Sequence, residues 1–329
     1  MLNIVHRRLS VNLYLTPIYF KERYVDLRKM IWFTAGLAFA FFGAITMLIN
    51  QKYKLDGQLI SGMRGVGVAA LYLPALFFLT PPTNKTFWLL IVAEGLISTF
   101  YNARLYESSG RYGASSTSLI NVLSIAIGMV FWWILYENRF LSLINTPAAF
   151  TGIVVSLFLV GGGFFFMTAN SLKKGEIAYM MPAVIAVAIM MIVRKEIMMH
   201  ADFMSAMAYY CACAIFFSGM ANLTLYSLKV GNVSKVAKKL ANKRILIVGV
   251  FMSLASATTI FMGNLSALYA PNPAYINALT LTTPLWTIGI NRLFGIKESV
   301  KIIPAAVMVA GLAMLIFFAD MPLRSTLGL

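Results

Sequence analysis

The sequence predicts an all-α polytopic membrane protein, with ten transmembrane helices arranged as two inverted five-helix repeats. Three observations lead to this prediction: a strongly apolar composition, ten hydrophobic segments joined by mostly short connections, and a polar pattern that occurs twice. Of the 329 residues, 60% are apolar and only 12% are charged. Soluble domains have about 25% charged residues. The composition therefore leaves no room for a soluble domain of ordinary size.

The net charge of +16 does not indicate nucleic-acid binding. The Lys and Arg residues are scattered through short loops, where they anchor helix ends at lipid headgroups. The two cysteines, Cys211 and Cys213, lie in an apolar run without a His or a further Cys nearby. We therefore expect inert buried thiols, and the sequence predicts neither a metal site nor a cofactor.

Ten hydrophobic segments have lengths that suit membrane-spanning helices. The first repeat, residues 30–170, contains helices over 30–49, 59–79, 87–102, 114–136 and 147–167. The second repeat, residues 171–320, contains helices over 177–193, 203–226, 245–269, 274–294 and 302–318. A basic arm, residues 1–29, is expected to lie on the headgroups, and residues 321–329 form a short tail. An odd number of spans per repeat inverts the second repeat relative to the first.

The ninth predicted helix carries a polar stripe at helical spacing, formed by Asn277, Thr280, Thr283, Thr287 and Asn291. Pro284 lies in the middle of this helix and predicts a kink. A related pattern occurs in the fourth predicted helix, where Ile127-Gly128 and Glu137 precede Ile288-Gly289 and Glu298 by the same offset of 161 residues. The matching offset indicates an internal duplication.

The charges of the loops do not determine the orientation, because the basic residues divide almost evenly between the two sides. The basic arm before the first helix favours a cytoplasmic N-terminus. The longest connection, residues 227–244, is rich in Lys and argues against it. This connection is interpreted either as a solvated run of charges or as an amphipathic segment on the membrane surface.

Several short motifs mark the two repeats: Ser61-Gly62-Met63-Arg64, Ala-Ser-Ser-Thr-Ser at 114–118, Gly-Glu-Ile-Ala at 175–178, Leu-Thr-Leu-Thr-Thr-Pro at 279–284, and the acidic residues Glu137 and Glu298. Together they resemble the drug/metabolite transporter superfamily, in its ten-helix branch built from two EamA-type repeats. The resemblance covers about residues 30–320, although Leu123 stands where the second repeat has Pro284. It implies a secondary transporter with a central substrate cavity and both termini in the cytoplasm, and it does not identify the substrate.

Two ionisable residues, Arg64 and Glu94, are predicted to lie within the membrane. A charge at the bilayer centre costs about 2.5–3.5 kcal/mol or more, so such residues face a partner or a cavity. In a structural interpretation, the two side chains pair with each other or with backbone carbonyls and hold two helices together. In a functional interpretation, one or both line the substrate path, and Glu94 exchanges a proton for a cationic group. The sequence leaves both open.

The third, fourth, eighth and ninth helices carry polar stripes, which must face water, substrate or other helices. We expect these four helices to line one cavity, with Glu94 as its carboxylate. The candidate substrate-binding residues are Glu94, Arg64, Asn121, Asn277, Thr280, Asn264 and Trp286. The polar ones have an alternative role in hydrogen bonding between helices. Trp286 either stacks on a flat or cationic substrate or packs against lipid and core.

Three functions compete on this basis. The favoured one is a secondary transporter that moves a small metabolite, amino acid or organic cation across the cytoplasmic membrane by alternating access, with a proton as the coupling ion and with export suggested by the resemblance alone. The second is a membrane enzyme, which would need grouped acidic or His residues; His6 and His200 belong to no such group, so we expect no catalytic residues. The third is a non-transporting membrane interaction protein, whose partners are lipid and other proteins.

Overall fold

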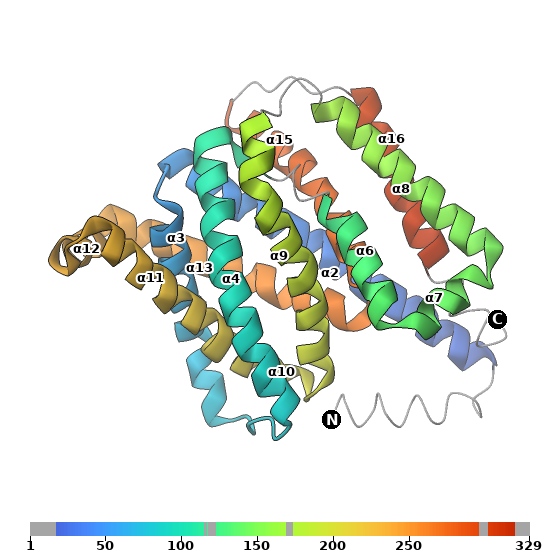
Figure 1. The fold of residues 1–329 in the computed structure, drawn as a ribbon, viewed down its shortest axis with the longest axis horizontal. Coiled ribbons are helices and arrows are strands. Elements are labelled where there is room, and N and C mark those ends of the chain that lie inside the picture. The colour runs from blue at the N-terminus through green and yellow to red at the C-terminus, as the bar shows by residue number, and fades with distance from the viewer. Residues whose placement is uncertain (1–17, 115–116, 118–122, 169–173, 296–301, 320–329) are drawn as a thin grey trace.

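The computed structural model describes residues 18–114, 117, 123–168, 174–295 and 302–319, and the secondary structure in these ranges is helical throughout (Figure 1). The first half contains α2 (Ile18–Tyr53), α3 (Gly57–Tyr72), the 3₁₀ turn η1 (Leu73–Phe77), α4 (Lys85–Tyr112), α6 (Leu123–Leu135), α7 (Glu137–Ile144) and α8 (Pro147–Thr168). The second half contains α9 (Lys174–Met199), α10 (Phe203–Tyr209), the π-helical segment η2 (Tyr210–Ile215), α11 (Phe216–Val230), α12 (Val233–Leu240), α13 (Lys243–Tyr269), α14 (Ala274–Leu279), the 3₁₀ turn η3 (Thr280–Thr282), α15 (Thr283–Leu293) and α16 (Ile302–Ala319).

Six helical stretches in the described part of the chain are long and apolar enough to cross a membrane: Asp26–Tyr53, Gly57–Phe77, Lys85–Tyr112, Ile177–Met199, Phe203–Val230 and Lys243–Tyr269. Shorter apolar stretches lie in α8 and α16. Large apolar side chains such as Phe77, Leu96 and Phe158 are exposed on the outer faces of the helices. This arrangement favours a membrane protein, because lipid-facing helices expose apolar side chains that a soluble protein would bury.

Helices α2, α4 and α9 are longer than the sequence predicts. Helix α2 begins at Ile18, so the described end of the basic arm is continuous with the first span. Helix α4 continues ten residues beyond 102, to Tyr112, and its C-cap is Gly113, whose φ of 101° lies in the region that favours glycine. Helix α9 continues past 193 to Met199, which places Arg194 and Lys195 inside a helix instead of in a loop. The hydrophobic pattern missed these ends because charged residues occupy regular helical turns there.

The helices of the two halves pack against each other in pairs, with α2 on α13, α4 on α9, α3 on α11 and α8 on α16. Figure 1 shows α8 and α16 side by side at one edge of the molecule and α11 and α12 at the opposite edge. The backbones of α3 and α11 approach each other closely, because a Cβ added at Gly65 would lie only 2.5 Å from the Cα of Gly219. Small residues at such crossings let backbones approach closely in membrane bundles.

Asp and Asn side chains cap helices in both halves of the chain. Asp56 caps α3 and accepts hydrogen bonds from the backbone N–H groups of Gln58 (2.9 Å) and Leu59 (3.4 Å). Asp202 caps α10 in the same way. Asn84 caps α4 and Asn242 caps α13, each through its side-chain oxygen. Each such cap satisfies backbone donors that a helix start leaves open.

The long basic connection contains a short amphipathic helix, α12. Its N-cap Asn232 accepts a hydrogen bond from the backbone N–H of Lys235 at 3.1 Å. Val236 is buried against a small cluster that includes Leu59 and Tyr226, while the lysines of α12 are exposed. Of the two interpretations of residues 227–244, the structure therefore supports the amphipathic segment.

The ninth predicted helix is interrupted next to Pro284. The chain leaves α14 at Leu279, passes through the 3₁₀ turn η3 and re-enters a helix at Thr283. Pro284 lacks the N–H that would bond to the carbonyl one turn earlier, so the helix cannot continue regularly through this point.

Candidate functional site

A cavity of about 90 Å³ lies between the helices of the two halves. Its wall is formed by α2, α3 and α4 from the first half and by α9, α13 and the η3–α15 segment from the second. The polar residues of the wall are Thr46, Arg64, Tyr101, Asn102, Tyr106, Arg194, Thr259, Thr280 and Thr283. Several of these positions lie well inside the candidate membrane spans, so the cavity combines polar groups with a location at membrane depth.

A second hollow is larger, about 310 Å³, but it is open and bounded by only a few residues of α3 and α13 and their neighbourhood: Leu71, Tyr72, Ala257, Thr258 and Phe261. None of these described lining residues is charged. A shallow, mostly apolar hollow on the outer face suits lipid contact better than recognition of a polar ligand, so the central cavity is the stronger candidate.

A buried ion pair lies beside the cavity. Glu94 of α4 is fully buried, and its Oε1 atom accepts a hydrogen bond from Arg194 Nε of α9 at 2.7 Å. The same oxygen accepts from the hydroxyl of Tyr210 at 2.8 Å and from Ser98 Oγ at 3.2 Å. Arg194 lines the cavity, whereas Glu94 lies behind it. The carboxylate therefore anchors the arginine that faces the cavity.

The local structure explains how these side chains meet. Val187, Met190, Met191 and Arg194 of α9 recur at the spacing of one helix face and all four line the cavity. Tyr210 is the first residue of the π-helical segment between α10 and α11, and its ring is fully buried. A π-helical segment shifts the helical register locally and often occurs at functional sites.

Arg64 of α3 is the second arginine of the wall. Only 6% of the residue is exposed, and its guanidinium lies over the ring of Tyr106, 5.9 Å from the centroid. The sequence allowed a pair between Arg64 and Glu94, but the structure gives Glu94 a different partner, Arg194. Glu94 therefore does not pair with Arg64. Arg194 reaches Glu94 because α9 continues past residue 193 and packs on α4.

Three of the remaining candidate residues lie near the break in the ninth helix or in α13, and Thr280 among them is only half-buried. Thr280 lines the cavity and donates its hydroxyl to the carbonyl oxygen of Asn277 at 2.6 Å. Asn277 and Asn264 are buried but do not line the cavity. The side-chain nitrogen of Asn264 contacts the sulfur of Met207 at 3.2 Å. These two asparagines have the environment of helix-packing residues.

The last two candidates lie elsewhere. Trp286 is 40% exposed and packs edge-on against Phe41, with ring centroids 5.2 Å apart. It does not line the cavity. Asn121 falls outside the described residues, as does Glu298. Among the sequence candidates, Arg64 and Thr280 are thus the two that the structure brings to the cavity wall.

Lys195, next to Arg194, has a structural position. Its ammonium donates to the carbonyl oxygen of Ala267 at 3.0 Å and also to that of Ala270, at the end of α13. The Lys195 ammonium also lies 5.4 Å from the centroid of the Trp132 ring. A cation at a helix C-terminus is stabilised by the last carbonyl groups. Adjacent residues of α9 therefore serve the cavity and the packing of α13.

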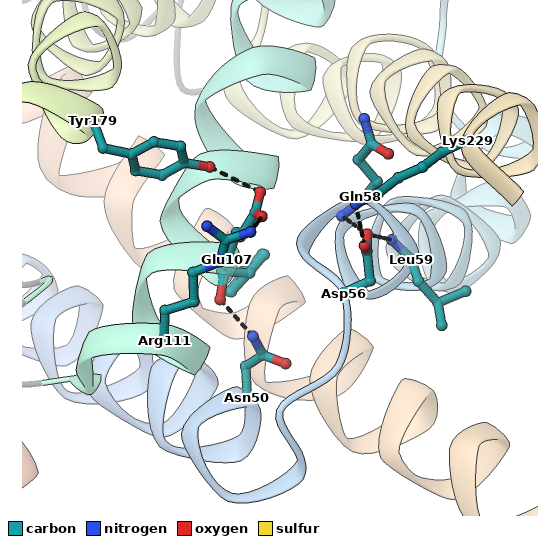
Figure 2. A network of polar contacts seen from close by, with 9 residues as sticks. Asn50, Asp56, Gln58, Leu59, Glu107, Arg111, Tyr179 and Lys229 are labelled. Carbon is teal, nitrogen blue, oxygen red and sulfur yellow. Dashed lines mark hydrogen bonds and ion pairs between the residues drawn. The ribbon is translucent and has the colours of Figure 1, made fainter. Parts of the chain in front are cut away.

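A polar network joins several helices at one end of the molecule (Figure 2). Glu107 of α4 pairs with Arg111 and accepts a hydrogen bond from the hydroxyl of Tyr179 of α9 at 2.8 Å. Asp56 pairs with Lys229 of α11 at 2.7 Å. Asn50 of α2 donates to the carbonyl oxygen of Tyr106 at 2.5 Å. Along α4, Glu107 follows the cavity-lining residues 101–106 and Glu94 precedes them, so the network and the Glu94–Arg194 pair lie on opposite sides of the cavity.

Sequence analysis named neither Arg194 nor Tyr210 as a site residue. The helical spacing of Val187, Met190, Met191 and Arg194 was a usable signal, because it extends the sixth helix face by one more turn. Tyr210 had no such signal, since its position depends on the π-helical segment. Within the described residues, no group of three or more His, Cys, Asp or Glu could hold a metal ion.

The comparisons with known proteins bear on the fold only. No family model matches the chain, and no curated protein matches it. Among solved structures, one described only as "Crystal structure of protein" superposes with a TM-score of 0.62 at 13% sequence identity. The match covers 89% of this chain and 96% of that chain. The chain therefore shares its overall architecture with a solved protein whose sequence is very different.

Proposed function

We propose that the protein is a secondary transporter that moves a small metabolite across the cytoplasmic membrane by alternating access, as a ten-helix member of the drug/metabolite transporter superfamily. The observation that carries the proposal is the central cavity, whose wall combines helices of both halves with polar side chains at membrane depth. Polar groups inside a membrane bundle mark substrate pathways when they face a cavity. Transport by relative movement of two halves requires such a site between them.

The packing of the helices supports the inverted repeat that this mechanism needs. In such a repeat, the helices of the first half, α2, α3, α4, α6 and α8, correspond in order to α9, α10–α11, α13, α14–α15 and α16. Replacing each helix by its counterpart then turns the α2–α13 contact into the α9–α4 contact. The α3–α11, α6–α14 and α8–α16 contacts convert into themselves. The repeated Asp and Asn caps fall on corresponding helices. A pseudo-two-fold relation accounts for all of these features together.

The cavity has a polar contact set on each side, which suits a site that opens alternately. On one side, Glu94 and Tyr210 hold Arg194 between α4 and η2. On the other side, Glu107 and Tyr179 connect α4 to α9. The interruption before Pro284 provides a place where the ninth helix bends. Rocking of one half against the other breaks one contact set while it preserves the other.

A cysteine at position 43 tests this proposal. Gly43 lines the cavity, and a Cβ added there meets no atom within 4 Å, so Gly43→Cys fits the structure. The variant is made in a chain whose two cysteines are replaced, Cys211→Ala and Cys213→Ala. A membrane-impermeant thiol reagent is then applied to right-side-out and to inside-out vesicles. Alternating access predicts labelling of residue 43 from both sides.

The matched control is Leu96→Cys, which lies on α4 near the level of Glu94 but is 57% exposed on the outer face of the bundle. Lipid covers such a position, so the reagent is expected to leave it unlabelled from either side. Labelling of position 43 from one side only would contradict alternating access. Absence of labelling from both sides, with the protein folded in the membrane, would favour a non-transporting interaction protein.

A further inference from the structure

The charges on the cavity wall have one sign. Of the described residues that line the cavity, Arg64 and Arg194 carry a charge, and none is Asp or Glu. Guanidinium groups stay charged in proteins, so neither arginine can lose its charge by releasing a proton. The sequence predicted a cavity with Glu94 as its carboxylate and a small metabolite, amino acid or organic cation as its substrate. The wall instead presents cations to whatever occupies the cavity.

Glu94 balances only one of these two charges. Its Oε1 atom accepts from Arg194 Nε at 2.7 Å, and the carboxylate is fully buried behind that arginine. The second terminal nitrogen of Arg194, Nη2, lies 3.2 Å from the sulfur of Met190, which is a weak acceptor. The pair therefore fixes Arg194 at the wall and leaves a surplus of one positive charge, which belongs to Arg64.

Arg64 lacks an anionic partner within the described part of the chain. Its Nε atom is buried and has no hydrogen-bond acceptor there. Its guanidinium contacts the ring of Tyr106, which stabilises a cation but accepts no strong hydrogen bond. Burying a charge without a partner is costly, so buried arginines are normally paired with an anion. Arg64 lines the cavity, so an anion bound there would supply the partner that the described residues do not.

The neutral polar groups of the wall are arranged to accept hydrogen bonds. The hydroxyls of Thr46, Thr259 and Thr280 donate to backbone carbonyls of their own helical segments, at 2.8, 2.7 and 2.6 Å. The Nδ2 atom of Asn102 donates to the carbonyl oxygen of Ser98 at 2.8 Å. With these donors engaged, their oxygens remain for donors of a ligand, and the arginines remain as donors for an anion.

We infer that the cavity binds a small organic anion, whose carboxylate or phosphate group pairs with Arg64 and contacts the Arg194 guanidinium, while hydroxyl or amino groups of the same molecule reach the threonine oxygens. Arginine is suited to this role because its planar donors match both oxyanions. The cavity volume of about 90 Å³ restricts the ligand in this conformation to a few heavy atoms. This inference rests on the proposed transport function, for which it names the substrate class.

The test uses the full chain, purified and reconstituted in lipid nanodiscs. Acetate, lactate and inorganic phosphate are titrated as anionic probes, and tetramethylammonium is titrated as a cation of similar size. We expect the anions to raise the apparent melting temperature and the cation to leave it unchanged, because a ligand that binds only the folded state stabilises it. Comparing the stabilisation by acetate and lactate with that by phosphate distinguishes a carboxylate site from a phosphate site.

Variants assign the effect to Arg64. Arg64→Gln should weaken the binding of the anionic probe by about tenfold or more, since a charge-assisted bidentate contact is lost. Arg64→Lys should retain part of the affinity, because it keeps the charge but not the planar donors. Arg111→Gln is the matched control, since it removes the same charge from an arginine that is exposed and outside the cavity. Its affinity should equal that of the unmodified protein.

Three results would overturn the inference: stabilisation by tetramethylammonium alone, stabilisation by none of the probes, or unchanged anion affinity in Arg64→Gln. If Arg64→Gln does not fold, Arg64→Lys decides, and an unchanged affinity in that variant counts against the inference. The transport proposal fails separately, through one-sided or absent labelling of Gly43→Cys. Labelling from both sides together with no anion binding would reject the substrate class and retain the transporter.

Discussion

Helix α4 carries two carboxylates that each pair with an arginine, but in opposite environments. Glu94 and Arg194 join two helices and are almost completely buried, with side-chain exposures of 0% and 6%. Glu107 and Arg111 lie one turn apart on the same helix, with exposures of 25% and 59%. The chemistry of the two pairs is the same. Burial and the number of helices joined therefore determine which pair the fold depends on.

Opposite consequences follow for stability. An exposed ion pair contributes about 0–1 kcal/mol, because water and salt screen it and ordering long side chains costs entropy. Breaking a buried pair costs about 3–5 kcal/mol, because one charge remains in a low-dielectric interior without its partner. In this protein the buried pair also holds an arginine at the cavity wall, so its loss should affect ligand binding as well as stability.

The largest effect is expected for Glu94→Gln. The substitution keeps the shape of the side chain but leaves Arg194 charged and buried without a counter-ion. We expect a loss of about 3–5 kcal/mol of stability, measured as a lower apparent melting temperature in nanodiscs. If Glu94 exchanged a proton with the substrate, Glu94→Gln would remove the pH dependence of transport in a protein that stays folded. The buried contacts of Glu94 make destabilisation the first effect to measure.

The double variant Glu94→Gln, Arg194→Gln sharpens this comparison. Removing both charges should restore a large part of the stability that Glu94→Gln loses, since the uncompensated charge is gone. Arg194→Gln alone should cost less than Glu94→Gln, because an unpaired buried carboxylate can bind a proton and become neutral, whereas a guanidinium cannot release one. Equal and additive losses in both single variants would contradict a direct pair.

The sequence predicted the helical architecture through its hydrophobic segments, and each predicted helix within the described residues coincides with an observed one. Pro284 correctly located the interruption of the ninth helix, because loss of one backbone donor acts locally. The ends of α2, α4 and α9 were wrong. Charged residues close to the end of an apolar run look like loop residues, although a helix can continue through them while their side chains find partners in other helices.

The site was predicted less well, and the reason lies in long-range packing. Arg64 and Glu94 were identified from the cost of a charge within the membrane, which is a property of a single position. Their partners depend on which helices become neighbours. Arg194 reaches Glu94 only because α9 packs on α4, and Tyr210 reaches it only from the π-helical segment. One sequence without related sequences contains no direct signal for such contacts.

An intermediate effect is expected at Asp56, which combines a helix cap with an exposed ion pair to Lys229. Asp56→Ala removes both interactions and should cost about 1–2 kcal/mol, mostly from the lost cap. Asp56→Asn keeps a good capping side chain and removes only the charge, so it should cost less than about 1 kcal/mol. Thermal unfolding of both variants separates the two contributions. Equal losses would mean that the ion pair, and not the cap, stabilises the start of α3.

The smallest effect is expected for Arg111→Gln. Arg111 pairs with Glu107 one turn earlier in the same helix, so the pair connects no separate elements. Arg111 stabilises α4 through its i,i+4 contact with Glu107 and through its positive charge in the last turn of the helix, and the two contributions together are below about 1 kcal/mol. Without Arg111, the Glu107 carboxylate keeps the hydrogen bond from Tyr179 at 2.8 Å. The difference in melting temperature from the unmodified protein should therefore be small at low salt and should shrink further at high salt, where exposed charges are screened. A loss of stability comparable to that of Glu94→Gln, and unaffected by salt, would contradict this prediction. It would show that the Glu107–Arg111 pair is shielded from water in the membrane, so that exposure in the isolated chain does not explain the difference in stability between the two pairs.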